Sequence, residues 1–115
     1  MKKIAAFIWI TALLTGFYAC SGGHEKQLSE KTAKVWGNCD QCKATIEKAG
    51  KIEGVDNVNW NEDSKLLTLT LDTNQVTLDA VLKSVADAGY DNELYTAPGD
   101  AYANLPDCCQ YERKP

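Results

Sequence analysis

Residues 36–42 read Trp36-Gly37-Asn38-Cys39-Asp40-Gln41-Cys42, a Cys-x-x-Cys motif that follows a short run with strand character. The second cysteine stands at the start of a segment with helical character. Both sulfurs can therefore point at one small ion, and a helix N-terminus favours the thiolate form of cysteine. Soft thiolates select Cu(I), Zn(II) and related metals over hard cations. The same spacing also suits a redox disulfide, so the rest of the chain has to decide between the two.

Strand and helix patterns alternate around this motif. Leu67, Leu69 and Leu71 alternate with threonines at the period of a half-buried strand. Thr77 is a plausible N-cap for a helix whose apolar positions recur at helical spacing until Gly89. Taken together, the patterns predict strands at 32–36, 55–60, 66–71 and 90–96, and helices at 42–51 and 78–88.

The resulting order is strand, helix, strand, strand, helix, strand. In about 65 residues this order suits an α+β, ferredoxin-like βαββαβ sandwich, with a four-stranded antiparallel sheet and both helices on one face. Right-handed crossovers would put the first and third strands side by side in the middle of the sheet. The Cys-x-x-Cys loop and the connection at residues 88–91 then lie at the same end of the domain.

Five segments carry a family resemblance. They are Gly37–Cys42, Ile46, Ile52–Val55, Leu66–Leu71 and Ala88–Asp91. In this order they resemble the heavy-metal-associated domain of copper chaperones, metal-pumping ATPases and periplasmic mercury-binding proteins. The resemblance covers about residues 31–96.

The resemblance implies that Cys39 and Cys42 bind one soft metal ion, Cu(I) by preference and Zn(II) or Hg(II) as alternatives. A near-linear two-thiolate site of this kind hands its ion on by thiolate exchange, to a metal-transporting membrane protein or to another metal-binding domain. Tyr90 falls where the family often places an aromatic residue against the metal loop, so it either shields the site or simply packs there. The family usually has methionine where this chain has Gly37, which predicts a looser loop or a gap filled by Trp36.

The N-terminal region predicts export from the cytoplasm. Residues 1–19 combine a basic start with a short apolar run, which is typical of a secretory signal. Their junction with Cys20 resembles a bacterial lipoprotein signal, so we expect a lipid on Cys20 and a protein anchored to a membrane of the cell envelope. Residues 20–30 are polar and predict a flexible tether. His24 lies in this tether, where a solvent-exposed side chain is expected rather than a ligand.

Composition narrows the classes of function. The formal net charge is −4, which argues against nucleic acid as a partner. No Ser/His/Asp set, catalytic carboxylate pair or phosphate-binding loop is recognisable, so we expect a binding protein rather than an enzyme. The alternative reading is an extracytoplasmic thiol-disulfide redox protein that uses the same cysteine pair. A thioredoxin-like fold fits poorly, because it is longer and needs a cis-proline facing the disulfide, whereas all three prolines follow the last predicted strand.

Residues 97–115 form a tail beyond the family resemblance, and they contain the adjacent pair Cys108 and Cys109. Adjacent cysteines make a poor crosslink because a vicinal disulfide is strained. The last predicted strand would end about 20 Å from the metal loop, a distance that the tail is long enough to span. Cys108 or Cys109 could then complete a three- or four-thiolate site, which would favour Zn(II) or clustered Cu(I). The pair could equally form a second site, pair with another chain, or stay reduced.

Overall fold

The computed structural model describes residues 26–115. The predicted signal at residues 1–19, the predicted lipid attachment at Cys20 and most of the predicted tether, including His24, lie outside the described residues. Within the described part, no helix is long and apolar enough to cross a membrane.

Three antiparallel strands form the sheet, in the spatial order β1-β3-β2. They are β1 (Leu28–Lys34), β2 (Val55–Trp60) and β3 (Leu66–Asp72). The alternation predicted for β3 is confirmed, because its three odd-numbered leucines are buried on the inner face. The predicted adjacency of the first and third strands is also confirmed. β1 starts earlier than expected, so the last residues of the predicted tether belong to the sheet.

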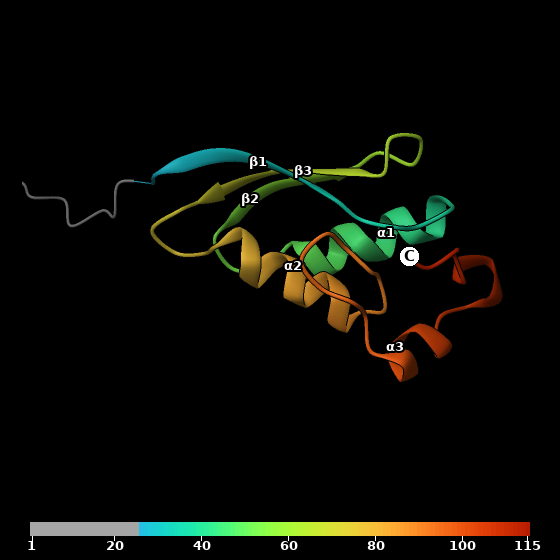
Figure 1. Ribbon diagram of the computed structural model, residues 1–115. Coiled ribbons are helices and arrows are strands. Elements are labelled where there is room, and N and C mark those ends of the chain that lie inside the picture. The colour runs from blue at the N-terminus through green and yellow to red at the C-terminus, as the bar shows by residue number, and fades with distance from the viewer. Residues whose placement is uncertain (1–25) are drawn as a thin grey trace, which may run out of the picture.

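Two main helices cover one face of the sheet (Figure 1). They are α1 (Asp40–Gly50) and α2 (Leu78–Asp87). The predicted N-cap of α2 is confirmed, since the Thr77 hydroxyl accepts a hydrogen bond from the Ala80 N–H at 3.1 Å. Gly89 closes this region with φ +109°, a backbone conformation that favours glycine. Ile46 of α1 is fully buried in the core between the helices and the sheet.

Residues 90–96 do not form the fourth strand that the sequence predicts. They make an isolated antiparallel bridge in which Asn92 pairs with Val35. The side-chain oxygen of Asn92 then accepts hydrogen bonds from the N–H groups of Leu94 at 3.1 Å and Tyr95 at 3.0 Å. An asparagine that satisfies the following backbone N–H groups favours a turn over an extended strand. The chain therefore leaves the sheet after one bridge.

The tail folds back against the domain in two short helical segments. They are α3 (Gly99–Ala103) and η1 (Asp107–Cys109). Figure 1 shows η1 and the C-terminus beside the N-terminal end of α1. Because the turn at Asn92 replaces the last strand, the tail never runs to the far end of the sheet. It reaches the metal loop by a shorter route than the sequence suggests.

Candidate metal centre

The loop thiols lie at the N-terminal end of α1. Cys39 is the N-cap residue, with an extended backbone, and Cys42 lies in the first turn. Their Sγ atoms are 3.5 Å apart. Cys42 is fully buried, whereas Cys39 is partly exposed. One thiol of the motif therefore faces the interior, and the other can be reached from solvent.

Trp60 forms the floor beneath this loop. A Cβ added at Gly37 would lie 2.9 Å from the Cη2 atom of Trp60 and 3.2 Å from Cδ1 of Ile46. Trp60 is fully buried, and its indole N–H donates to the carbonyl of Val35 at 3.0 Å. The indole thus occupies the space under the position where the family usually has methionine. Trp36, which we expected to fill this gap, lies partly exposed beside the ammonium group of Lys34.

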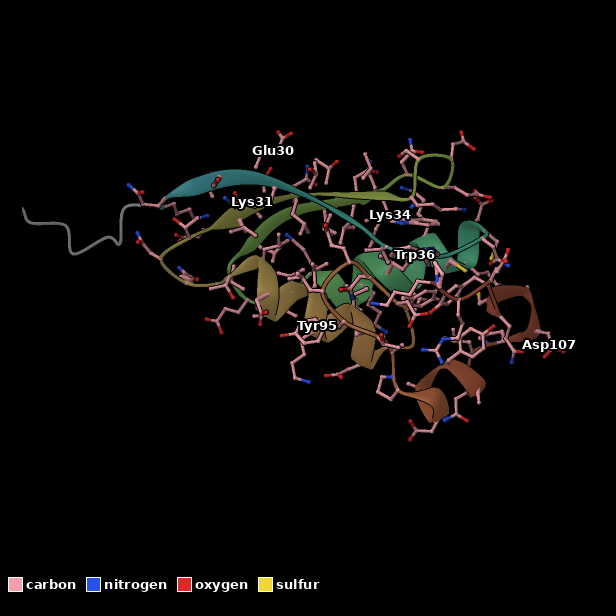
Figure 2. All side chains as sticks on the ribbon, in the orientation of Figure 1. Glu30, Lys31, Lys34, Trp36, Tyr95 and Asp107 are labelled. Atoms are coloured by element: carbon pink, nitrogen blue, oxygen red, sulfur yellow. The ribbon has the colours of Figure 1, made fainter. Side chains whose placement is uncertain are left out.

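The tail brings two further thiols to the loop. The Sγ atom of Cys109 lies 3.8 Å from Sγ of Cys39 and 3.8 Å from Sγ of Cys108. The sulfurs of Cys39, Cys108 and Cys109 all lie within 4.8 Å of one another. Cys109 is buried and Cys108 is exposed. Figure 2 shows sulfur atoms gathered between the start of α1 and the segment that Asp107 opens.

Two loop amides contact these thiols. The thiol of Cys42 donates to Oδ1 of Asn38 at 3.0 Å. The thiol of Cys108 donates to Oε1 of Gln41 at 2.6 Å. Gln41 lies inside the Cys-x-x-Cys motif, so the loop itself holds a thiol of the tail. Neither amide was singled out from the sequence, because a polar residue in a loop carries no signal of what it will contact.

The four-cysteine neighbourhood shifts two thiol pKa values in opposite directions. Burial raises the pKa of Cys39, but hydrogen bonds from the backbone and side chain of Cys42, and from Cys109, outweigh it and hold the pKa below its ordinary value. Burial, with the neighbouring thiols of Cys42 and Cys39, raises the pKa of Cys109 to about 12. Cys39 is thus the readier metal ligand, and Cys109 needs a cation beside it to lose its proton.

Tyr90 lies against this cluster, as the sequence predicts. Its ring is fully buried, and its hydroxyl has no hydrogen-bond partner among the described residues. Burial, followed by the nearby thiols of Cys42 and Cys109, raises the pKa of Tyr90 well above its ordinary value. A buried hydroxyl is costly unless an acceptor lies close to it, and the thiols of Cys42 and Cys109 lie beside this one. A thiolate carrying a metal would be such an acceptor.

An ion pair at Asp91 fastens the tail. Arg113 donates from Nε to Oδ2 of Asp91 at 3.0 Å and from Nη2 to Oδ1 at 2.7 Å. The Asp91 side chain is fully buried, and the Arg113 side chain is 32% exposed. The N–H of Ala97 donates to the same carboxylate at 2.7 Å. Burial raises the pKa of Asp91, but the hydrogen bonds from Arg113, Ala97 and Lys114 more than offset this and hold its pKa below the ordinary value.

Tyr111 adds a second attachment. Its hydroxyl accepts from the N–H of Asp91 at 2.7 Å and donates to the carbonyl of Gly89 at 2.8 Å. Its ring stacks on Tyr90 with centroids 5.4 Å apart. The hydroxyl of Tyr102 donates to the carbonyl of Tyr111 at 2.6 Å. The ion pair and Tyr111 together, which we call the tail clasp, hold the chain just after the position that Cys109 occupies.

Comparison with known proteins assigns the segment that carries this loop. Residues 38–91 match the family of heavy-metal-associated domains. They are a heavy-metal-associated domain. The matched segment contains Cys39, Cys42 and Tyr90 and ends at Asp91, so the tail cysteines lie outside it.

Three known proteins are also similar to this chain. The mercuric transport protein periplasmic component of Serratia marcescens is 29% identical over 96 residues, which is 82% of this chain and 98% of that protein. A candidate copper-ion-binding protein from Bacillus anthracis has a similar structure, with a TM-score of 0.57 and 28% identity over 60% of this chain and all of that one. A CopZ metallochaperone follows with a TM-score of 0.53 and 27% identity, covering 56% of this chain and 98% of that one. These likenesses agree with the ferredoxin-like arrangement of the two main helices and the antiparallel sheet.

Within its described part, the structure brings together the candidate site residues that the sequence predicts. The four cysteines of the two pairs gather at one end of α1, and Tyr90 lies beneath them. Sequence reasoning missed Trp60 as the floor of the loop and missed the tail clasp entirely. An aromatic and a basic residue two and four positions after Cys109 were the available signal for the clasp. Their buried partner, Asp91, lies too far away in the chain to be paired with them by pattern.

Proposed function

We propose that this chain binds a soft heavy-metal ion through Cys39 and Cys42 and passes it on, as a metallochaperone or scavenger. Cu(I) is the first candidate, and Zn(II) and Hg(II) are the alternatives. The observation that carries this proposal is the pair of thiols 3.5 Å apart at the start of a helix, inside a heavy-metal-associated domain. Sulfur ligands suit soft ions of this kind.

Transfer would proceed by exchange of thiolates. A partner thiolate forms a bond to the ion while the bond from Cys39 breaks, and the displaced thiolate takes up a proton from solvent. No electron moves, so the oxidation state of the ion is unchanged. Cys39 is partly exposed, so a partner thiolate can reach an ion bound to it, whereas Cys42 is buried.

The setting of this function is also part of the proposal. The similarity to a periplasmic component of mercuric transport supports an extracytoplasmic location. The partner would be a metal-transporting membrane protein or another metal-binding domain. Attachment to a bacterial membrane through a lipid on Cys20 remains a prediction from the sequence, as does the absence of enzymatic activity.

An anaerobic competition titration with Cu(I) tests the proposal. The reduced chain is titrated against a chromophoric Cu(I) chelator, beside the double variant Cys39→Ser/Cys42→Ser. We expect tight binding of one ion to the native chain and its loss in the variant. Binding that survives the loss of both loop thiols would contradict the proposal. Weak binding by the native chain, together with ready cycling between dithiol and disulfide, would favour the redox alternative instead.

A further inference from the structure

The four sulfurs form two triangles that share an edge. The shared edge joins Cys39 and Cys109, whose Sγ atoms are 3.8 Å apart. The outer triangle adds the exposed Cys108. The inner triangle adds the buried Cys42, which is 3.5 Å from Cys39 and interacts with the Cys109 thiol. One triangle therefore opens to solvent, and the other lies above Tyr90 inside the protein.

The separations within these triangles suit more than two ligands on one ion. With metal–sulfur bonds of about 2.3 Å, a linear ion holds two sulfurs about 4.6 Å apart, a trigonal ion about 4.0 Å and a tetrahedral ion about 3.8 Å. The sulfur–sulfur distances of 3.5, 3.8 and 3.8 Å lie at or just below the short end of this range. The loop pair of Cys39 and Cys42 is thus closer than a two-thiolate linear site would need.

Contacts outside the sulfur cluster also hold the tail thiols in place. The tail clasp fixes the chain after Cys109, through the buried carboxylate of Asp91 and the hydroxyl of Tyr111. Cys109 itself is 1% exposed, although it belongs to a short segment near the end of the chain. Beneath it, the buried hydroxyl of Tyr90 lacks a hydrogen-bond partner among the described residues and faces the sulfurs of the inner triangle.

We propose that Cys109 is a third ligand of the metal site, and that Cys108 is the ligand through which the ion enters and leaves. The ion first binds the outer triangle, formed by Cys39, Cys108 and Cys109. It then moves to the inner triangle, formed by Cys39, Cys42 and Cys109. The tail clasp determines whether the third sulfur is present, and so separates a holding state with three sulfurs from a transfer state with two.

The step between the triangles is a substitution of one ligand. The ion keeps its bonds to Cys39 and Cys109 throughout. A bond to the Cys42 sulfur forms while the bond to Cys108 breaks; the Cys42 proton leaves, and Cys108 takes one up. The exchange is neutral in protons and electrons and needs no further reactant.

This inference rests on the proposed function, but the two can fail separately. The measurement is X-ray absorption at the copper edge on the full reduced chain with one equivalent of Cu(I), which counts the sulfurs around the ion. We expect three sulfurs in the native chain, three in Cys108→Ser and two in Cys109→Ser. We also expect the affinity of Cys109→Ser to fall by at least about tenfold, the size of effect that even supporting residues have at metal sites. Loss of binding confined to the loop variants would leave the proposed function intact and overturn this inference.

Kinetics and a matched control complete the test. Cys108→Ser should slow removal of Cu(I) by an external chelator several-fold while leaving the equilibrium affinity nearly unchanged. Arg113→Ala keeps every thiol but opens the tail clasp, so it should lower the sulfur count toward two. Glu112→Ala is the control, because Glu112 makes no hydrogen bond or ion pair among the described residues and changes the charge of the same segment.

Three outcomes would overturn the inference. One is an unchanged sulfur count and affinity in Cys109→Ser, checked in Cys109→Ala if the serine variant does not fold. Another is a count of four that falls to three in Cys108→Ser, which would mean a fixed four-sulfur site without the exchange step. The third is equal effects of Arg113→Ala and Glu112→Ala, which would mean that the tail clasp does not control the third sulfur.

Discussion

The loop pair and the tail pair of cysteines reach the same place by different physical means. Cys39 and Cys42 are placed by the hydrophobic core, through a helix that begins at the loop and a buried indole beneath it. Cys108 and Cys109 are placed by a buried carboxylate and two tyrosine hydroxyl groups, together with the packing of the Tyr111 ring on Tyr90. Apolar packing is non-directional and shared by many residues. A polar attachment depends on a small number of exact partners.

This difference has a consequence for metal exchange. A loop fixed by the core keeps its geometry whether or not an ion is present. A tail held largely by polar contacts separates more easily than a core helix, because water can replace its hydrogen bonds and few apolar side chains besides Tyr111 have to leave the core. The ligands that would have to move during transfer are therefore the ones on the separable segment. Substitutions in the core should therefore change the loop, and substitutions in the tail clasp should leave the loop unchanged.

Removing the floor of the loop should have the largest effect. Trp60→Ala deletes a fully buried side chain and should lower the free energy of unfolding by about 3–5 kcal/mol. Trp36→Ala is the matched control, because Trp36 is only partly buried and packs at the edge of the core. Urea denaturation of the reduced, metal-free chain measures both. Equal losses in the two variants would show that the indole of Trp60 has no special place under the loop.

Much of the fold of the sheet and the two main helices could be predicted from the sequence, because apolar periodicity indicates directly which side of a helix or strand is buried. The alternation in β3 and the N-cap at Thr77 are local signals, and both predictions are confirmed. The family resemblance also indicated that the loop and Tyr90 would meet. What failed was the prediction of a last strand at residues 90–96, since nothing in their sequence showed that the Asn92 side chain would close a turn.

For the tail, the sequence predicted only that it was long enough to reach the metal loop. Chain length allowed the second cysteine pair to approach the loop, but nothing in its pattern indicated where it would bind. The decisive contact joins Arg113 to Asp91 across 22 positions of sequence. A pair of opposite charges at that separation is one of many that the sequence offers, and only the fold selects it. Burial of Trp60 beneath Gly37 escaped prediction for a similar reason, because it depends on how a strand crosses the loop.

Acid should loosen the tail more than the core. The pKa of Asp91 in the folded chain is below its ordinary value of about 3.9, so the carboxylate stabilises the fold fully above that pH and loses its contribution as pH falls through the folded pKa. The groups facing it are the guanidinium of Arg113 and the backbone N–H groups of Ala97 and Lys114. None of the facing side chains changes its charge between pH 7 and pH 3.

The measurement compares urea denaturation of the native chain with that of Asp91→Asn between pH 7 and pH 3. The native chain should be more stable by about 1–3 kcal/mol at pH 7, the range for hydrogen bonds to a charged group, and this difference should shrink below about pH 4. Asp87→Asn is the control, because the Asp87 carboxylate is exposed and, within residues 26–115, forms an ion pair only with Lys83, at 3.5 Å. A difference that stays constant down to pH 3 would mean that the Asp91 carboxylate does not fasten the tail.

The smallest effect on the fold should come from Tyr90→Phe, and its sign separates the two roles that the sequence left open for Tyr90. The buried hydroxyl has no hydrogen-bond partner among the described residues, so its removal should leave the stability of the metal-free chain unchanged or raise it by about 1 kcal/mol. If the hydroxyl donates to a thiolate in the metal-bound state, the same change should lower the Cu(I) affinity by a few-fold. Denaturation and chelator competition on one variant then distinguish a packing residue from one that stabilises the bound ion. A variant with unchanged affinity would leave the ring of Tyr90, stacked on Tyr111, as a support for the tail alone.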